Sequence, residues 1–444
     1  MNLLLVYPRF HYAAFGELQE PLGILSVAAS LRAAGFTVEL GDLTLAESLE
    51  VLDDPLARAE AVGLSSSTAL FGLSLRVLER IRRQRPELPV ILGGPHATAC
   101  PEECLASGFD AAVIGEGEAT AIELFTRLAE KGDPAGIPGV AVRRDGKIIS
   151  GPGRPFIPDL DALPFPARDL IDYEGYKRNN LIHVGLFASR GCPYRCSFCK
   201  PMQDILFGKK VRGRTPKSMV QEMREARELI GPRPFLFRDD TLPMLGIPWF
   251  EGLAGAKAEA GLGDSLFACQ ARVDLITPEL LAAMKRAGCQ GIAFGVESGS
   301  QRVLDYYQKK IRVEDTVRAF DLCREFGIGT HAFIMLGAAI ETREDVAATL
   351  ALVRRIRPNS ISTSFTTPAP GSQLYLEMAE DGHCPYASYE DVDYLLNSVP
   401  LPHPHLSREE LVAAQQALVE LVPTTYHPDA LRAQRERWRM NGHP

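Results

Sequence analysis

The 444-residue sequence predicts an α/β protein with four segments: a doubly wound N-terminal domain (1–150), a linker (151–183), a partial (β/α)6 barrel (184–375) and a mostly helical C-terminal tail (376–444). Three observations predict this order. Short apolar runs alternate with helical patterns over the first domain, which is typical of βαβ units and a parallel sheet. The linker is rich in proline and aspartate, which disfavours regular structure. The alternation then resumes for six βα units, which favours a partial barrel.

Each element of the first domain follows from its own pattern of apolar residues and turn signals. The expected strands are 3–8, 37–43, 61–67, 89–94 and 111–118, and the expected helices are 22–36, closed by Gly35, and 70–86. In the barrel the expected strands are 184–189, 234–240, 266–272, 291–298, 329–337 and 360–368. The tail is expected to be irregular until a short helix at 407–422, and to act as a lid over the barrel.

Composition limits the classes of function and location. An apolar fraction of 46% suffices for buried cores, and a net charge of −8 argues against nucleic acid as a partner. The start, "MNLLLVYPRF", lacks a charged n-region and predicts a buried strand rather than a signal peptide. We expect no integral membrane segment, because no apolar run reaches roughly 18 residues. Cysteines scattered singly outside one cluster favour a cytoplasmic location.

That cluster is "ASRGCPYRCSFCK" at 188–200, which holds Cys192, Cys196 and Cys199. A structural zinc site needs four ligands, and the nearest candidate for the fourth is His183. A disulfide with a leftover thiol and chance clustering are the other structural readings. The functional reading is a [4Fe–4S] cluster held by three thiolates, with one iron left open for another ligand.

The CX3CX2C pattern after a strand resembles that of the radical S-adenosylmethionine (SAM) superfamily. The resemblance implies that the cysteines hold a [4Fe–4S] cluster whose open iron binds the amino and carboxylate groups of SAM. It also implies that an electron, from a donor such as flavodoxin or ferredoxin, cleaves SAM to methionine and a 5′-deoxyadenosyl radical. SAM then binds at the iron that has no cysteine ligand.

Further residues stand where the resemblance implies SAM contacts. Phe198 would lie beside the adenine, and Asp239 and Asp240 end the second barrel strand. Arg272 would bind the SAM carboxylate, because a guanidinium group fits a carboxylate bidentately, and Glu297 would bind the ribose hydroxyls. A surface ion pair or a helix cap is the alternative for each residue alone. One departure is "MLGAAIET" in place of the "GLPGET"-like turn usual after the fifth strand.

The N-terminal domain resembles the Rossmann-like cobalamin-binding domain of the B12-binding radical SAM family, which includes the class B methyltransferases. Glycines at strand ends let a bulky ligand approach the backbone, and nearby hydroxyls can hold its nucleotide tail. The residues that carry the resemblance are Ser65, Ser66, Thr68, Gly93, Gly94, Pro95, His96, Gly115, Glu116, Gly117 and Glu118. A domain that binds nothing, or a different nucleotide, is the alternative; the missing GXGXXG disfavours NAD and FAD. The DXHXXG signature is also absent from this domain, so we expect cobalamin without a histidine as lower ligand.

Together these resemblances imply a cobalamin-dependent radical SAM C-methyltransferase acting on an unactivated carbon of a small molecule. One SAM would methylate cobalamin and a second would supply the radical. The alternative is a cyclase or rearrangement enzyme that uses both cofactors without transferring methyl. A cofactor sensor is disfavoured by the intact cysteine motif, and a methylthiotransferase by the presence of only Cys100 and Cys104 in the first domain. The substrate and the oligomeric state are not predicted.

Overall fold

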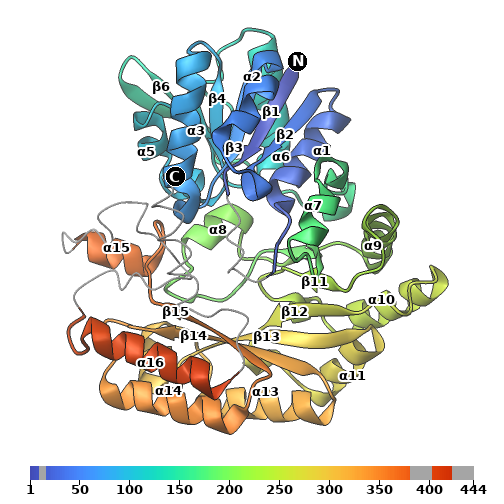
Figure 1. Cartoon of the computed structure of the whole chain (residues 1–444), viewed down its shortest axis with the longest axis vertical. Helices are drawn as coiled ribbons and strands as arrows, with labels where there is room; N and C mark the ends of the chain where they lie inside the picture. Colours follow the sequence, from blue (N-terminus) through green and yellow to red (C-terminus); the bar gives the residue numbers. More distant parts are fainter. Residues whose placement is uncertain (10–16, 381–402, 423–444) are drawn as a thin grey trace.

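The computed structural model describes residues 1–9, 17–380 and 403–422. Two α/β domains lie one above the other, with the N-terminal domain at the top of Figure 1 and the barrel below it. The carboxyl ends of the N-terminal strands point toward the barrel, so the loops that follow them lie between the domains.

The N-terminal domain is a seven-stranded sheet covered by helices on both faces. Its elements are β1 (Asn2–Tyr7), α1 (Leu22–Ala33), β2 (Thr37–Asp42), α2 (Asp53–Arg58), β3 (Ala61–Ser65), α3 (Phe71–Gln84), β4 (Val90–Gly93), α4 (Pro95–Ala99), α5 (Pro101–Ala106), β5 (Ala111–Val113), α6 (Gly117–Ala129), β6 (Val140–Arg144) and β7 (Lys147–Ser150).

The strand order is β2-β1-β3-β4-β5-β6-β7, and the first five strands are parallel. β1 shows why the sequence folds this way: successive side chains alternate between the faces of a strand, and both faces are covered. Leu3 and Leu5 join one buried cluster, whereas Leu4 and Val6 join the other. The antiparallel hairpin of β6 and β7 was not predicted from the sequence.

The linker is more regular than predicted. It contains α7 (Tyr173–Arg178) and two short 3₁₀ turns, so the prediction of no regular structure is wrong for these residues. α7 is capped by Asp172, whose side chain accepts a hydrogen bond from the Gly175 N–H. The apolar side chains of Tyr173 and Tyr176 anchor this helix in the barrel core.

The second domain is a curled six-stranded sheet in the order β15-β14-β13-β12-β11-β8, with every neighbouring pair parallel. This confirms the predicted partial barrel. Its elements are β8 (Val184–Leu186), β9 (Ser189–Arg190), α8 (Met202–Phe207), β10 (Arg212–Gly213), α9 (Pro216–Ile230), β11 (Phe235–Phe237), α10 (Ile247–Glu259), β12 (Phe267–Ala271), α11 (Pro278–Arg286), β13 (Cys289–Glu297), α12 (Gln301–Tyr306), α13 (Val313–Glu325), β14 (Gly329–Leu336), α14 (Arg343–Ile356) and β15 (Ser360–Phe365).

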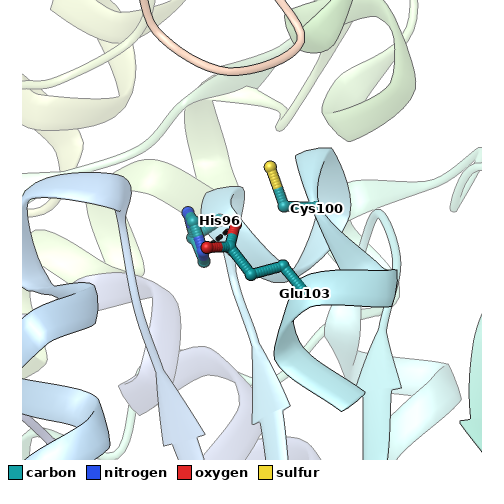
Figure 2. A group of neighbouring side chains, drawn as sticks. All are labelled: His96, Cys100 and Glu103. Atoms are coloured by element: carbon teal, nitrogen blue, oxygen red, sulfur yellow. Dashed lines mark ion pairs between the residues drawn. The ribbon is translucent and has the colours of Figure 1, made fainter. Parts of the chain in front are cut away.

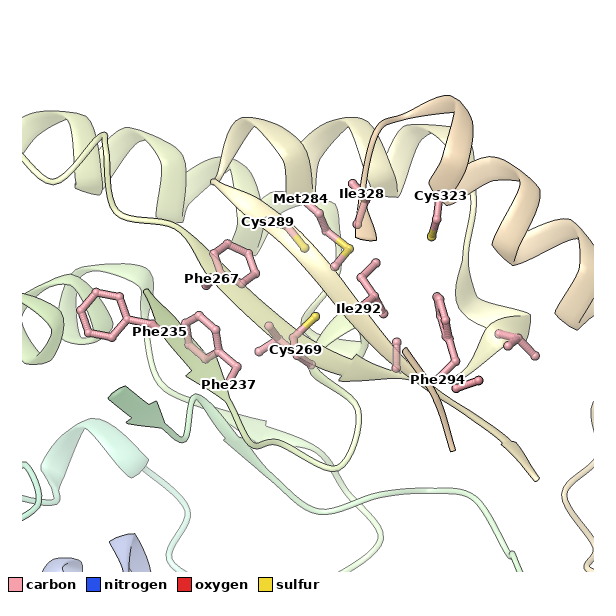
Figure 3. Packing of buried hydrophobic residues seen from close by; sticks show 14 of the residues in the cluster. Phe235, Phe237, Phe267, Cys269, Met284, Cys289, Ile292, Phe294, Cys323 and Ile328 are labelled. Atoms are coloured by element: carbon pink, nitrogen blue, oxygen red, sulfur yellow. The ribbon is translucent and has the colours of Figure 1, made fainter. Parts of the chain in front are cut away.

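The barrel core lies between the sheet and its outer helices. Figure 3 shows Phe235, Phe237, Phe267 and Cys269 of adjacent strands on that side of the sheet, and Met284 of α11 packs among them. Because these side chains alternate along each strand, the residues between them face the concave inner side. The inner side is therefore left for ligands.

The tail begins with a helix, α15 (Gln373–Glu380), where irregular structure was expected. The predicted second helix is present as α16 (Arg408–Leu421), and its Leu411 and Leu418 are buried in the barrel core. This helix packs on α14 and β15 at the outside of the barrel. The rest of the predicted lid, at 381–402 and 423–444, lies outside the described residues. Within the described ranges, no helix has both the length and the apolar character needed to cross a bilayer.

Candidate active site

The three clustered cysteines lie on the loop between β9 and α8, at the carboxyl end of the first barrel strand. The loop is braced by its own backbone, because the N–H groups of Cys199 and Lys200 both donate to the Cys196 carbonyl. The Lys200 Nζ donates to the Cys192 carbonyl at 2.8 Å. Burial, together with the charges of the nearby Asp240 and the other two thiols, raises the pKa of the Cys199 thiol to about 12.

These thiols suit a cluster better than a single ion. Among the described residues, one group of three or more histidine, cysteine and carboxylate side chains has all its ligand atoms within 4.8 Å of one another, and it contains none of these three cysteines. The zinc alternative also lacks support from His183, because this histidine belongs to no such group; its Nδ1 lies 2.8 Å from Glu17 Oε1. The three thiols thus lie too far apart to share one metal ion, and in the described part of the chain no fourth ligand joins them. This arrangement fits an iron–sulfur cluster with an open position.

Arg272 lies directly beside the cysteine loop. Its Nη1 is 3.7 Å from Cys196 Sγ, and its guanidinium group stacks on the Tyr194 ring at 3.7 Å from the ring centre. Asp274 binds Nε and Nη2 at 3.0 Å each, and the Lys309 carbonyl accepts from Nη2 at 2.8 Å. The side chain is thus fixed next to the thiols at the position predicted for a carboxylate-binding residue.

Glu297 ends β13 with a φ of +62°, a conformation that non-glycine residues rarely adopt and that is concentrated at functional sites. Its Oε1 accepts a hydrogen bond from Lys309 Nζ at 2.6 Å, and both side chains are buried. The same ammonium group lies 5.6 Å from the Phe198 ring centre, and Phe198 packs edge-on against Tyr307. The structure thus brings Phe198, Arg272 and Glu297 together around Lys309, which the sequence analysis missed.

Asp239 and Asp240 follow β11 on the side facing the N-terminal domain. Asp239 is 1% exposed, and it accepts hydrogen bonds from the Ala188 N–H and the Ser189 hydroxyl. Burial raises the pKa of Asp239 to about 7, although these hydrogen bonds act in the opposite direction. Asp240 accepts from the Gln203 side chain, and burial raises its pKa as well.

A cavity of about 420 Å³ lies between the two domains. Both Asp239 and Asp240 line it, together with Phe187, Ser189 and Arg190 from the segment directly before the cysteine loop. From the N-terminal domain it is lined by apolar side chains of the sheet and of α1 and α6, and by eight of the predicted cofactor residues: Ser65, Gly93, Gly94, Pro95, Gly115, Glu116, Gly117 and Glu118. Such a volume is within the range of small-molecule sites, roughly 300–1,000 Å³.

The fit of this cavity to a cobalamin depends on its backbone and its lining. Gly94 has a φ of +92°, and a Cβ there would lie 2.8 Å from the Ser66 carbonyl oxygen, so only glycine fits. Gly115 has a φ of +80°. The glycine-edged rim and an apolar wall that includes Leu5, Val113 and Phe125 suit a large ligand with an apolar base on its tail.

Three predicted cofactor residues lie outside the cavity lining: Ser66, Thr68 and His96. The Ser66 hydroxyl donates to the Ser67 carbonyl and accepts from Ser74, both at 2.9 Å. His96 is fully buried, with its ring 3.9 Å from that of Phe71 and its Nδ1 3.2 Å from Thr68 Oγ1. These three side chains therefore support the ends of the strands from outside the cavity lining.

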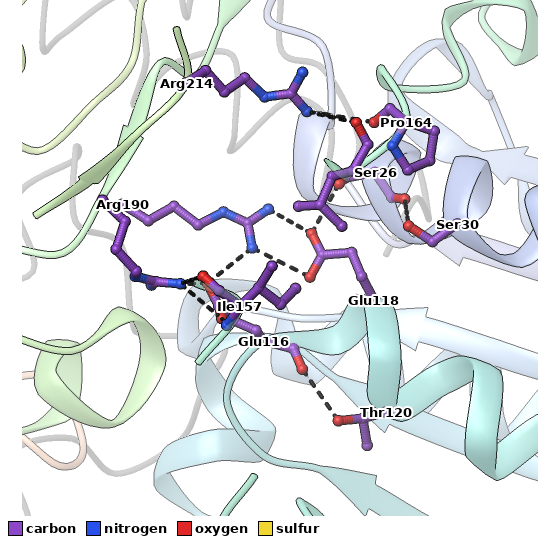
Figure 4. Close-up of polar contacts among 11 residues, drawn as sticks. Ser26, Ser30, Glu116, Glu118, Thr120, Ile157, Pro164, Arg190 and Arg214 are labelled. Carbon is purple, nitrogen blue, oxygen red and sulfur yellow. Dashed lines mark hydrogen bonds and ion pairs between the residues drawn. The ribbon is translucent and has the colours of Figure 1, made fainter. Parts of the chain in front are cut away.

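Two predicted cofactor residues, Glu116 and Glu118, form buried ion pairs with the barrel instead of projecting freely into the cavity (Figure 4). Glu116 Oε1 accepts from Arg190 and Arg212, each at 3.0 Å, and its Oε2 accepts from the Ile157 N–H at 2.8 Å. Glu118 accepts from Arg190 and, at 2.8 Å, from Ser26. Burial alone would raise the pKa of Glu118, but the charge and hydrogen bonds of Arg190 lower it.

A second set of buried charges continues this network into the linker. Arg168 binds Glu20 Oε1 at 2.8 Å and Glu222 Oε1 at 2.7 Å, and Glu20 Oε2 accepts from the Gly185 N–H of β8 at 2.7 Å. We call the two sets the interdomain charge cluster; its members are Glu20, Glu116, Glu118, Arg168, Arg190, Arg212, Arg214 and Glu222. It joins the cofactor cavity, the linker and the cysteine loop.

Comparisons with known proteins agree with this architecture. The family model of the B12 binding domain matches residues 9–125, and that of the radical SAM superfamily matches residues 186–353. The barrel and its three-cysteine loop define a radical SAM enzyme. With a B12-binding domain in the same chain, the protein has the domain composition of cobalamin-binding radical SAM enzymes, whose cofactors are cobalamin, SAM and a [4Fe–4S] cluster.

Two relatives and one solved structure show how far the similarity extends. An uncharacterised methyltransferase of Pyrococcus horikoshii is 29% identical, over 84% of this chain and 82% of its own length. An anaerobic magnesium-protoporphyrin IX monomethyl ester cyclase of Rubrivivax gelatinosus is 28% identical, over 86% of this chain and 70% of its own. The radical SAM methyltransferase TsrM of Kitasatospora setae, solved with cobalamin and a [4Fe–4S] cluster, superposes with a TM-score of 0.77 at 20% identity, covering 95% of this chain and 89% of its own.

Proposed function

We propose that this enzyme is a C-methyltransferase that transfers a methyl group from cobalamin to an unactivated carbon of a small molecule. One observation carries the proposal: a single cavity is lined both by the predicted cobalamin residues and by the two elements that flank the cysteine loop, β9 before it and the end of α8 after it. A chain that cleaves SAM and carries a methyl group needs the two cofactors to face a common space, because radical transfer depends on close placement. The methyltransferases among the relatives support this activity.

Each cofactor has residues that would hold it. Cys192, Cys196 and Cys199 would ligate the cluster, and Arg272, Glu297 and Phe198 would bind the carboxylate, ribose and adenine of SAM. The eight predicted residues that line the cavity would hold cobalamin. When bound, the cluster supplies the electron that cleaves SAM, and cobalamin supplies the methyl group.

The chain's own side chains fix the orientation of these ligands. Asp274 and Tyr194 hold the Arg272 guanidinium in place, and Lys309 holds Glu297. His96 is the one histidine in the described part of this domain; its Nδ1 faces Thr68 and it does not line the cavity, so it would not serve as a ligand of cobalamin.

The concave side of the barrel supports a small, largely uncharged substrate. On β14, His331 and Phe333 alternate with buried core residues and therefore face inward, and Phe333 is 36% exposed. Their rings pack edge-on at 4.8 Å, and Ser360 Oγ lies 2.7 Å from His331 Nδ1. Burial lowers the pKa of His331 to about 4, so its imidazole is neutral. An aromatic and hydroxyl-bearing surface of this kind suits an uncharged ring system.

A second candidate is a cyclase or rearrangement enzyme that uses both cofactors without methyl transfer, and the similarity to the magnesium-protoporphyrin cyclase favours it. The products separate the two activities. A methyltransferase of this kind forms 5′-deoxyadenosine and S-adenosylhomocysteine together, whereas the cyclase forms no S-adenosylhomocysteine.

Two further parts of the proposal concern the surroundings of the enzyme. We expect a flavodoxin- or ferredoxin-type protein to supply the electron. We also expect a cytoplasmic location, because the cysteines in the described part of the chain are all free thiols.

The first experiment is an anaerobic reconstitution with iron, sulfide and hydroxocobalamin, followed by desalting and a visible spectrum. We expect close to one equivalent of cobalamin beside the broad cluster absorption. The matched control replaces Cys192, Cys196 and Cys199 with alanine; it should lose the cluster and keep cobalamin, because the cofactor residues of the N-terminal domain are unchanged. A wild-type protein that retains the cluster but no cobalamin would overturn the proposed methyl transfer. Labelled SAM and candidate substrates then test which products form.

A further inference from the structure

We propose that His96, Cys100 and Glu103 form a separate binding site for a divalent cation of the zinc type, with one coordination position open. Their ligand atoms all lie within 4.8 Å of one another. Figure 2 shows His96 and Glu103 facing each other, with Cys100 beside them at the junction of two helices. None of the three residues lines the interdomain cavity, so the site is distinct from the cobalamin position.

The local fold brings the three residues together. α4 begins at Pro95, directly after Gly94, and ends at Ala99; α5 begins at Pro101. Cys100 is the single residue between them, and a φ of −133° there breaks the helix. His96, in the first turn of α4, and Glu103, in the first turn of α5, are therefore folded back toward Cys100.

His96 is held in an orientation suited to metal binding. Its Nδ1 lies 3.2 Å from Thr68 Oγ1, which fixes the ring and turns Nε2 toward Glu103 Oε2 at 3.7 Å. A second hydrogen-bonding partner on the other ring nitrogen is the usual arrangement for a histidine that ligates a metal.

The donor set selects the class of cation. Imidazole nitrogen, thiolate sulfur and carboxylate oxygen are together the ligands of zinc, whereas magnesium and calcium prefer oxygen alone. Burial and the charges of Glu103 and Glu102 raise the pKa of the Cys100 thiol to about 12. A bound cation reverses this, because its charge favours the thiolate. Three protein ligands leave a fourth position of a tetrahedral site for water or another ligand.

The site lies close to the contact between the domains. α4 packs against α8, the helix that follows Cys199. A Cβ on Gly371, next to α15, would lie 3.3 Å from the Ala99 Cβ. A cation bound at the junction of α4 and α5 would therefore stabilise the part of the N-terminal domain that contacts α8.

The test uses the holoenzyme, loaded with cluster and cobalamin and then equilibrated with chelator-buffered Zn²⁺. Zinc and iron are measured by mass spectrometry after desalting, and Cys100 is alkylated with iodoacetamide and quantified in its peptide. We expect one zinc per chain, and slower alkylation of Cys100 in its presence. Constant iron content shows that zinc has not replaced the cluster.

Matched variants separate ligands from neighbours. Cys100→Ser and Glu103→Gln should lose the zinc, whereas Cys104→Ala, a buried thiol four residues further along α5, should keep it. Thr68→Val should weaken zinc affinity about 10- to 100-fold, as expected for a partner of a ligating histidine. The proposal is overturned if the wild type holds no more zinc than Cys100→Ser, or if zinc leaves the alkylation of Cys100 unchanged.

Discussion

Replacing Glu116 with glutamine tests whether the interdomain charge cluster holds the two domains together. The Glu116 side chain is 4% exposed and contacts two arginines of the barrel and the backbone of the linker. Breaking a buried ion pair by removing one partner costs about 3–5 kcal/mol, because the other charge is left uncompensated. Arg190 keeps Glu118, and Arg212 keeps the carbonyls of Ile157 and Phe207. We therefore expect a smaller loss of about 2–4 kcal/mol.

The loss is measured by equilibrium unfolding of the holoenzyme in urea, taking the first transition because a two-domain chain need not unfold in one step. The matched control is Glu123→Gln, which removes the same charge from α6, the helix that begins directly after Glu116. Glu123 pairs with Arg154 and its side chain is 41% exposed, so its loss should cost about 0–1 kcal/mol. If the two variants differ by less than about 0.5 kcal/mol, the ion pairs of Glu116 do not stabilise the docking of the domains.

Three further predictions concern the barrel. Burial raises the pKa of Glu341 from its usual 4.5 to about 7, so the folded state binds this proton more tightly than the unfolded state does. The free energy of unfolding of the wild type should therefore fall as the pH rises from 4.5 to 7. Between pH 5 and 7 this fall should be about 2–3 kcal/mol smaller in Glu341→Gln, which has no proton to release. Arg272→Lys should weaken SAM binding about 10- to 100-fold in equilibrium dialysis while the iron content is unchanged. The guanidinium group binds Asp274 through Nε and Nη2 and still directs Nη1 toward the cysteine loop, and a lysine ammonium group cannot do both; equal affinity would exclude Arg272 as the carboxylate partner. Gly299→Ala should lower thermal stability by about 1–3 kcal/mol, because its Cβ would lie 2.4 Å from the Ala348 carbonyl oxygen. The control is Gly255→Ala, which should not destabilise the protein because no atom lies within 4 Å of the new Cβ. Equal melting temperatures of the two variants would contradict the clash at Gly299.

The parts of the fold that were predicted are those with a strong local pattern. β1 and the six barrel strands are short apolar runs bounded by turn residues, and such runs predict buried parallel strands. The hairpin of β6 and β7 was missed because only its first three residues are buried, so the pattern is weak. α7 was missed because prolines before it suggested a continuous irregular segment, whereas the helix begins only after Asp172.

In the site, the sequence motif predicted which residues gather but not their partners. Arg272, Glu297 and Phe198 lie together near the cysteine loop, as their order along the strands suggested. Lys309 gave no signal, because a lysine pair after two tyrosines has no distinguishing pattern. The partners of Glu116 and Glu118 could not be predicted either, since Arg190 is more than seventy residues away in the chain. The SAM-binding roles of Phe198, Arg272 and Glu297, and the cobalamin-binding roles of Glu116 and Glu118, stay predictions.

The interdomain charge cluster also limits how such domains can be recombined. Arg190 stands two residues before Cys192, while its carboxylate partners belong to the N-terminal domain. A chimera whose N-terminal domain lacked these two carboxylates would leave Arg190 and Arg212, which are largely buried, without their charge partners. We therefore expect the Gly-Glu-Gly-Glu turn and the segment from Arg190 to Arg214 to be exchangeable only as a set, so that the two domains evolve as one unit.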